Sequence, residues 1–144
     1  MHVQNILSSK GDTAVITVRP DDAIADVAQT LAERRIGGVV VSNDGTDIVG
    51  ILSERDIVRS LALRGAVCLQ EKAQDMMTRN PTCCHLQDTS DEVLQRMTDG
   101  RFRHMPVVDD EILVGIVTIG DVVKARLQEL AMERNALEGM VKGW

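Results

Sequence analysis

The sequence predicts an α+β protein in which two copies of a strand-helix-strand-strand-helix unit pack through their sheets with pseudo-two-fold symmetry, followed by an extra C-terminal helix. The 144-residue chain contains one nine-residue phrase twice, as GILSERDIV at 50–58 and GIVTIGDVV at 115–123. β-rich runs and apolar residues at helical spacing follow the same order around both phrases. Because a unit of roughly 50 residues has too small a core to be stable by itself, we expect the two units to pack together.

A nearly constant offset relates the two copies. The residues that match at an offset of 65 are Gly50 and Gly115, Ser53 and Thr118, and Asp56 and Asp121. Those that match at an offset of 66 lie upstream and are Val27 and Val93, Leu31 and Met97, Arg35 and Arg101, and Val41 and Val107. The difference of one residue falls in the loop that contains residues 42–47 in the first copy and 109–111 in the second. Such repetition indicates two structural copies of one unit.

The first copy begins with a β-rich run at 14–18, which predicts a strand. The sequence Pro20-Asp21-Asp22 then predicts the start of a helix whose Ile24, Val27 and Leu31 share one face. The other predicted elements of this copy are strands at 39–41 and 48–52, joined through the hairpin signature Asp44-Gly45, and a helix at 56–63 before Gly65.

The second copy repeats this order. Thr89-Ser90-Asp91-Glu92 is a capping box before a helix that carries Val93 and Met97. The other predicted elements are strands at 82–85, 105–108 and 112–117, and a last helix at 121–137. We therefore expect a first repeat with the N-terminal segment at 1–65, a linker at 66–80, a second repeat at 81–127 and a helical extension at 128–144.

Composition excludes several classes of protein. Only Phe102 and Trp144 are aromatic, the formal net charge is -6 and the pI is near 5.0, which argues against a nucleic-acid binder. An apolar run of about 18 residues, as a membrane span needs, does not occur. Cys68, Cys83 and Cys84 have no framework spacing and no signal peptide precedes them, so we expect a reduced, cytoplasmic protein.

Neither a metal site nor an active site is predicted. Cys83, Cys84 and His85 are consecutive, and adjacent residues of a strand point to opposite faces, so these side chains cannot easily converge on one ion. The chain lacks a phosphate-binding GxxxxGK[ST] loop, a GxSxG elbow and an HExxH motif. We expect no enzyme activity.

The phrases IGGVVVSNDGTDIVGILSERDIV and FRHMPVVDDEILVGIVTIGDVV, in tandem, give the chain a family resemblance. Over roughly residues 11–127 it resembles a cystathionine-β-synthase (CBS) domain pair, also called a Bateman module, without an attached catalytic domain. The resemblance implies a regulatory protein that binds an adenine nucleotide in the cleft between the repeats, and a disk of two chains.

The resemblance also implies which residues bind ligand. One ligand would have its ribose at Thr118 and Asp121 and its base near Ile16, Ile36, Gly37 and Gly38. A second would have its ribose at Ser53 and Asp56 and its base near Cys83, Phe102, Arg103 and His104. Apolar walls with backbone amides suit a purine.

Phosphate contacts are expected at one of the two ligands. The second copy has Arg103-His104 where the first has Gly37-Gly38, and the resemblance implies that this pair reaches the phosphates of the ligand at Asp121. The ligand at Asp56 would meet only glycines there, with Arg55 as compensation. Lys10 is a further candidate contact, with an exposed lysine in a loop as the alternative.

The Ser53-x-x-Asp56 and Thr118-x-x-Asp121 elements have two interpretations. As helix caps, the hydroxyl accepts from an unpaired amide and the carboxylate suits the positive end of the helix dipole. As a binding element, the same carboxylate holds a pair of ribose hydroxyls. The two interpretations are compatible.

The chain ends carry apolar residues that could take part in assembly, and the family resemblance makes a homodimer the expected assembly. A partly apolar stripe continues along the last helix, and residues 2–7 form a short apolar N-terminal stretch. The residues of the stripe are Val122, Leu127, Leu130, Ala131, Leu137 and Met140. Such a stripe more often packs on its own domain or on a second copy than on a membrane.

Three hypotheses about the function remain open. The first is a regulatory module that binds AMP, ADP, ATP or NAD(H) and transmits energy or redox state to an unknown protein target. The second is a ligand-free dimerisation or adaptor domain in which the hydroxyl-x-x-Asp elements only cap helices. The third is a binder of S-adenosylmethionine, for which Arg103 would be dispensable.

Overall fold

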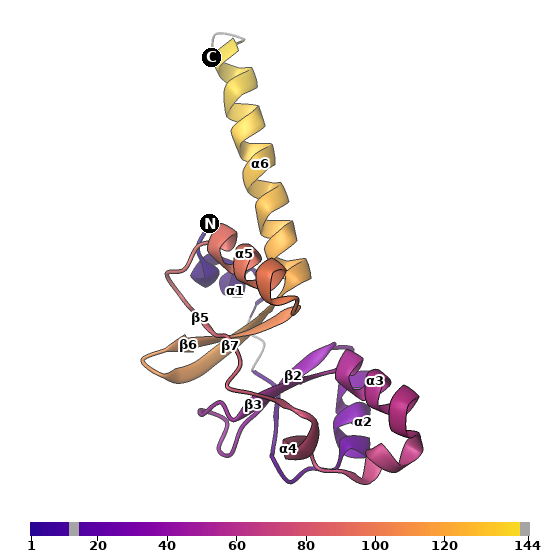
Figure 1. Cartoon of the computed structure of the whole chain (residues 1–144). Helices are drawn as coiled ribbons and strands as arrows, with labels where there is room; N and C mark the ends of the chain where they lie inside the picture. The colour runs from indigo at the N-terminus through magenta and orange to yellow at the C-terminus, as the bar shows by residue number, and fades with distance from the viewer. Residues whose placement is uncertain (12–14, 142–144) are drawn as a thin grey trace.

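The computed structural model describes residues 1–11 and 15–141, and it confirms the α+β fold of two repeated units with a long C-terminal helix (Figure 1). The elements of the first half are α1 (Val3–Ser9), β1 (Thr17–Val18), α2 (Ile24–Arg34), β2 (Gly38–Val41), β3 (Gly50–Ser53), α3 (Glu54–Arg64), the 3-10 helix η1 (Ala66–Gln70), α4 (Ala73–Met76) and β4 (Thr78–Arg79). Those of the second half are β5 (Cys84–His85), α5 (Ser90–Gly100), β6 (His104–Asp109), β7 (Ile112–Thr118) and α6 (Ile119–Val141).

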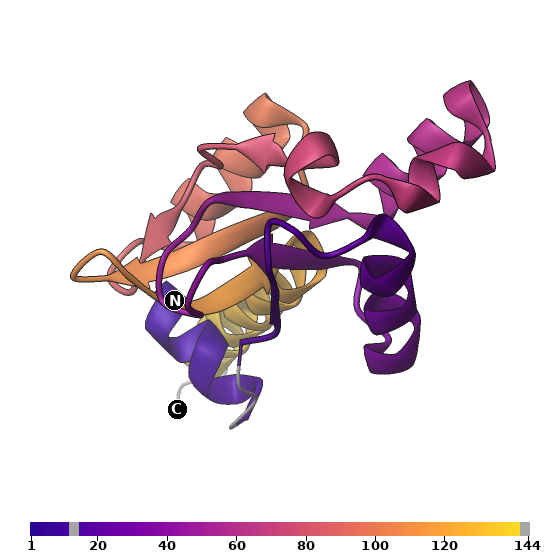
Figure 2. The same cartoon turned by 90° about the horizontal axis from the view of Figure 1, so that it is seen from below.

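Each repeat contributes one sheet. The first sheet has the order β1-β2-β3-β4 and the second has the order β5-β6-β7. In the first sheet β1 pairs parallel with β2, and β2 forms an antiparallel hairpin with β3. In the second sheet β5 pairs parallel with β6, and β6 forms an antiparallel hairpin with β7. The strands of the two repeats lie next to each other in the middle of the molecule, with α2 and α3 on one side and α1, α5 and α6 on the other (Figures 1 and 2).

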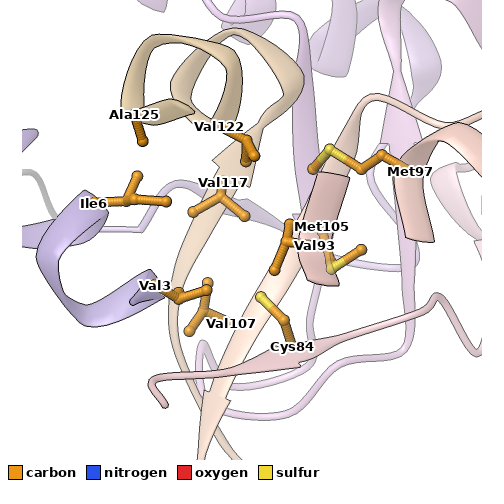
Figure 3. Close-up of a cluster of buried hydrophobic side chains, with 10 residues drawn as sticks. All are labelled: Val3, Ile6, Cys84, Val93, Met97, Met105, Val107, Val117, Val122 and Ala125. Carbon is orange, nitrogen blue, oxygen red and sulfur yellow. The ribbon is translucent and has the colours of Figure 1, made fainter. Parts of the chain in front are cut away.

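Each repeat has a hydrophobic core of its own. In the first repeat, Ile24, Val27 and Leu31 of α2 are buried against the sheet, as their helical spacing predicts. In the second, Val93 and Met97 of α5 pack on strands β5 to β7 (Figure 3). These two helices also end in the same way, because Arg35 and Arg101 adopt left-handed backbone conformations with φ of 54° and 57°.

The N-terminal helix α1 packs on the second repeat, although it precedes the first in sequence. Val3 and Ile6 are buried in the core of the second repeat (Figure 3). The amide of Val3 donates to the carbonyl of Asp88 at 2.9 Å, and that of Ser90 donates to the carbonyl of Met1 at 2.8 Å. The apolar N-terminal stretch is therefore a helix that completes the second core.

Several element boundaries differ from the prediction. Helix α2 begins at Ile24, because the Asp22 carboxylate accepts from the amide of Arg19 at 2.8 Å and holds the preceding turn. Strand β3 begins at Gly50, since Asp47 continues the loop by accepting from the Ser42 hydroxyl at 2.6 Å. The predicted first strand begins at Ala14, which lies outside the described residues. Short elements within 66–80, including β4 on the edge of the first sheet, were not expected.

Candidate functional site

Two cavities lie in the cleft between the repeats. The Asp56 cavity has a volume of about 340 Å³. Its lining residues are Ile51, Ser53, Arg55, Asp56, Arg59, Thr78, Asn80, Pro81, Thr82, Gly100, Arg101, Phe102, Arg103 and His104. The Thr118 cavity has a volume of about 690 Å³. Its lining residues are Leu7, Lys10, Gly11, Val15, Ile16, Arg34, Arg35, Ile36, Gly37, Gly38, His104, Val114, Gly115, Ile116 and Thr118. Both volumes are in the range of small-molecule sites.

Each cavity combines the helix start of one repeat with the helix-to-strand turn of the other. Residues at the start of α3, in the first repeat, face 100–104 of the second repeat across the Asp56 cavity. Thr118, which precedes α6 in the second repeat, faces 34–38 of the first across the Thr118 cavity. The two cavities are therefore related by the same pseudo-symmetry as the repeats.

Both hydroxyl-x-x-Asp elements cap a helix. Oδ2 of Asp56 accepts from the amide of Ser53 at 2.9 Å and from its hydroxyl at 3.0 Å. Oδ2 of Asp121 accepts from the amide of Thr118 at 2.9 Å, and the amide of Asp121 donates to the Thr118 hydroxyl at 3.1 Å. Within the described residues, no group donates to Oδ1 of either carboxylate. One oxygen of each carboxylate therefore accepts no hydrogen bond from the described residues, while the other caps the helix.

Lys10 forms an ion pair with Asp121, and this pair distinguishes Asp121 from Asp56. Its Nζ lies 2.8 Å from Oδ2 of Asp121 and 3.0 Å from the carbonyl oxygen of Ile116. Burial raises the pKa of Asp121, but the Lys10 ammonium and the Thr118 amide more than offset it, so the pKa lies below the ordinary value of 3.8. Among the described residues, Asp56 has no basic partner. The alternative for Lys10, an exposed lysine in a loop, does not hold in this structure.

His104 lies between the cavities and lines both. Burial lowers its pKa below the ordinary value of 6.5, although Glu54, Asp121 and Asp56 act in the opposite direction. Burial therefore favours the neutral form of this imidazole.

Gly38 occupies the position in the first repeat that His104 occupies in the second. A Cβ atom on Gly38 would lie 2.9 Å from Cδ2 and Cγ of His104, closer than real Cβ contacts. The two positions meet near the pseudo-two-fold axis, so the space between them holds one large side chain and no more. This contact explains why the repeats differ at this corner.

Most of the candidate residues line one of the two cavities. Those in the Asp56 cavity are Ser53, Arg55, Asp56, Phe102, Arg103 and His104, and those in the Thr118 cavity are Lys10, Ile16, Ile36, Gly37, Gly38, His104 and Thr118. Asp121 is not among the residues that line either cavity, and it forms an ion pair with Lys10. Cys83 lines neither cavity; it is half-buried and its thiol donates to the carbonyl of Pro81 at 3.4 Å.

Arg103 was assigned both to the base of the ligand at Asp56 and to the phosphates of the ligand at Asp121. It lines the Asp56 cavity, and its contact with a ligand at Asp121 stays a prediction. Its place in the Asp56 cavity follows from the crossed arrangement of the cleft, in which the turn of the second repeat faces the helix start of the first. Gly37, the counterpart of Arg103, lines the Thr118 cavity for the same reason.

Sequence reasoning also missed arginines that line the cavities. Arg59 lies one turn after Arg55 on α3, and this i,i+4 spacing on a helix next to a candidate ligand residue could have revealed it. Arg34 and Arg35, at the end of α2, line the Thr118 cavity.

Cys83 and Cys84 do not have the environment of reactive thiols. Burial raises the pKa of the Cys84 thiol to about 12, and burial also raises the pKa of Cys83. Within residues 1–11 and 15–141, no three His, Cys, Asp or Glu side chains are grouped so that they could hold a metal ion. No helix in the same ranges is long and apolar enough to cross a membrane.

Comparison with known proteins identifies the family. The model of the CBS domain matches residues 9–63 and 73–128, and the chain therefore belongs to the CBS domain family. Over 148 aligned residues it is 30% identical to the mitochondrial CBS domain-containing protein CBSX3 of Arabidopsis thaliana, covering 98% of this chain and 72% of that relative. A crystal structure of a CBS-domain protein from Agrobacterium tumefaciens is 44% identical, with a TM-score of 0.82 over 88% of this chain and 99% of the other.

Two similar structures contain ligands. A CBS domain protein from Pyrobaculum aerophilum was solved in complex with AMP; it is 27% identical, with a TM-score of 0.78 over 92% of this chain and 99% of that one. A CBS domain pair in complex with 5′-methylthioadenosine and S-adenosyl-L-methionine is also 27% identical, with a TM-score of 0.77 over 90% of this chain and 98% of the other. Both of these relatives bind compounds that contain adenosine.

Proposed function

We propose that this protein is a non-catalytic regulatory module that binds an adenosine-containing ligand in the cleft between its CBS repeats and transmits the bound state to a partner protein. The observation that carries this proposal is the helix-capping carboxylate of Asp56, which lines a cavity of ligand size and has its Oδ1 unbonded among the described residues. Asp121 caps α6 in the same way, next to Thr118, which lines the second cavity. A carboxylate in this position can accept hydrogen bonds from the two adjacent hydroxyls of a ribose.

The ligands of the two relatives support adenosine as the shared chemistry. AMP, 5′-methylthioadenosine and S-adenosylmethionine have the base and ribose in common and differ at the 5′ position. In this chain, the apolar part of each cavity suits a purine: Ile51 and Phe102 in one, and Ile16 and Ile36 in the other. AMP, ADP, ATP and NAD(H) are the ligands we propose first, and S-adenosylmethionine is the second candidate.

Thermal unfolding of the purified protein with AMP, ADP, ATP, NAD, NADH and S-adenosylmethionine tests this function. A ligand at about 100 times its Kd stabilises by roughly 2.7 kcal/mol, which raises the unfolding temperature by several degrees. We expect Asp56→Asn and Asp121→Asn each to reduce the shift, because the variants keep their shape and lose an acceptor charge. Folded protein that shifts with none of these ligands would leave the two elements as helix caps and favour an adaptor domain.

We infer further that the protein works as a homodimer. Apolar side chains remain exposed along α6, with Leu127 and Leu137 each 62% exposed. Helix α3, the counterpart of α6 in the first repeat, exposes Val58 at the position equivalent to Val123. Two related exposed faces suit a two-fold assembly of identical chains. Light scattering after size exclusion should give a dimer, and Leu127→Glu together with Leu137→Glu should give a monomer.

The compartment and the target stay predictions. We retain the cytoplasm as the expected location; the mitochondrial designation belongs to the Arabidopsis relative. Fusion of the intact chain to an affinity tag and recovery of partners with and without the stabilising ligand would identify a target whose association depends on that ligand.

A further inference from the structure

The ammonium group of Lys10 is bound to the carboxylate that we assign to a ligand at the Thr118 cavity. Its Nζ lies 2.8 Å from Oδ2 of Asp121 and 3.0 Å from the carbonyl oxygen of Ile116. Lys10 lines this cavity, whereas Asp121 is not among the residues that line it. The wall of the Thr118 cavity therefore contains the lysine and not the carboxylate that caps α6.

The equivalent carboxylate of the first repeat has no such partner. Asp56 lines its own cavity, and it forms no ion pair with any residue in the described ranges. Lys10 binds the carbonyl of Ile116, whose counterpart Ile51 pairs with Thr78 of β4. At this place the first repeat thus meets a threonine, which carries no charge to pair with Asp56.

Packing holds the backbone of Lys10 in place. Helix α1 is anchored through Val3 and Ile6 in the core of the second repeat, which is also the repeat of Asp121. The amide of Lys10 donates to the carbonyl of Leu7 at 3.2 Å, so the lysine directly continues this helix. Because the backbone is already ordered, the ion pair forms at the cost of side-chain freedom alone.

A ribose and this ammonium group compete for one carboxylate. The side chains of Lys10 and Asp121 are 29% and 23% exposed, so both are largely removed from water. Hydrogen bonds between two charged groups are stronger than those from neutral donors, and partial burial strengthens the attraction further. Ribose hydroxyls are neutral, and they replace the ammonium group only with a loss of electrostatic energy.

We propose that Lys10 is a built-in competitor of the ligand at the Thr118 cavity, so that the Asp56 cavity fills first and the Thr118 cavity fills only when Lys10 leaves Asp121. This inference rests on the proposed function, because both carboxylates are taken to hold a ribose. It gives the protein two affinities for one kind of ligand. The bound state then distinguishes two ranges of ligand concentration.

Titration calorimetry with adenosine tests this proposal, because adenosine has no phosphate that a lysine could attract. Asp56→Asn weakens the other cavity and leaves the Thr118 cavity to be measured. Addition of Lys10→Met to this variant should raise its affinity for adenosine about tenfold, since the ligand no longer has to displace a charge-assisted hydrogen bond. Circular dichroism of each variant verifies that it is folded.

Matched variants separate the charge of Lys10 from its place in the fold. Lys10→Arg keeps a cation, so Asp56→Asn with Lys10→Arg should bind adenosine as weakly as Asp56→Asn alone. Lys124→Met removes an exposed lysine that does not line the cavity, and it should leave the affinity within about twofold. In the presence of Asp121→Asn, Lys10→Met should give no gain at the Thr118 cavity, because the carboxylate in dispute is absent.

Added salt gives an independent readout. Salt weakens ion pairs and does not screen an uncharged ligand. The affinity of Asp56→Asn for adenosine should therefore rise as salt is added, whereas that of Asp56→Asn with Lys10→Met should stay level. A lysine with a purely structural role would not produce this difference.

Two results would overturn the proposal. A loss of affinity for adenosine or AMP on Lys10→Met would make the lysine a ligand contact, and an unchanged affinity would leave its ion pair as a structural contact. Both results leave the proposed function intact, because a ligand still binds. Absence of binding of adenosine and AMP by the folded wild-type protein would instead overturn the proposed function together with this inference.

Discussion

Lys10 and Asp121 form an ion pair inside the cleft, with Nζ 2.8 Å from Oδ2, and join positions 111 residues apart. Lys10 follows α1, whose Val3 and Ile6 are buried in the second core, so the lysine is held in place by packing as well as by charge. The carboxylate that caps α6 is thereby neutralised by the protein itself, whereas the equivalent Asp56 is not. Ligand binding at the Thr118 cavity therefore has to accommodate or displace an ammonium group.

Replacement of Lys10 by methionine should destabilise the protein at neutral pH by about 1 kcal/mol, because Asp121 is left half-buried without its partner. Asp121 has a pKa below 3.8 in the folded state, so its stabilising effect is present above that pH and is lost as pH falls through the folded value. The difference in free energy of unfolding between wild type and Lys10→Met should therefore become smaller in acid. Urea unfolding at a series of pH values measures it.

The control for this experiment is Lys124→Met, which removes an exposed lysine of α6 that forms no ion pair within the described residues. It should change stability little at any pH. The difference in free energy of unfolding between wild type and Lys10→Met could instead stay constant down to the lowest pH at which the protein folds. The lysine would then contribute through packing and not through its charge.

Stability should fall as the pH drops below 6.5 because of His104. Its folded pKa lies below 6.5, so between the two values the unfolded chain binds a proton that the folded protein does not. The folded imidazole faces Glu54, Asp56, Asp121 and Lys10, and burial outweighs the attraction of the three carboxylates. Denaturant unfolding between about pH 5 and 8 should show that the free energy of unfolding falls with decreasing pH, and that it falls less in His104→Asn.

His85→Asn is the matched control, because His85 is an exposed imidazole on β5. Comparison of the two variants separates the effect of the buried His104 imidazole from that of removing an exposed imidazole. If His104→Asn declined as steeply as wild type, another group would be responsible and the imidazole would not be neutral in the folded protein.

Introduction of a methyl group at Gly38 should destabilise the protein by about 1–3 kcal/mol, since its Cβ would lie 2.9 Å from the His104 ring. The same change should become nearly neutral when His104 is also replaced by glycine, because the two positions compete for one space. A double-mutant cycle measured by chemical denaturation gives the coupling directly.

Gly120→Ala is the control, because no close neighbour requires a glycine at this position. A Cβ there meets its nearest neighbour at an ordinary 3.6 Å, on the first turn of α6, so we expect a neutral or slightly stabilising effect. Additive costs for Gly38→Ala and His104→Gly would show that the two positions do not share one space.

Truncation of Ile6 to alanine should cost about 2–4 kcal/mol, although the residue lies in a seven-residue helix at the chain start. Ile6 is 2% exposed and packs in the second core (Figure 3). Leu63→Ala, on α3 where the side chain is 78% exposed, should cost less than about 0.5 kcal/mol. Equal costs, measured by urea unfolding, would contradict the role of α1 in the core.

Much of the fold could be predicted because it depends on residues close together in the sequence. The spacing of Ile24, Val27 and Leu31 predicts the buried face of α2, and the hydroxyl-x-x-Asp elements predict the starts of α3 and α6. The linker elements could not be predicted, since η1 and α4 are short and have no clear periodicity. The sequence left Arg103 assigned to both ligands for a different reason, because the cavity that a residue faces depends on how the repeats cross.

The sequence by itself determined the two repeats, their order of elements and the residues able to cap helices or contact a ligand, because periodicity, caps and turns arise from neighbouring residues. Tertiary structure alone decided that Lys10 neutralises Asp121, that His104 fills the space beside Gly38 and that four arginines converge on the Asp56 cavity. Each of these relationships joins residues from distant parts of the chain, and their distances are set by the packing of one repeat against the other.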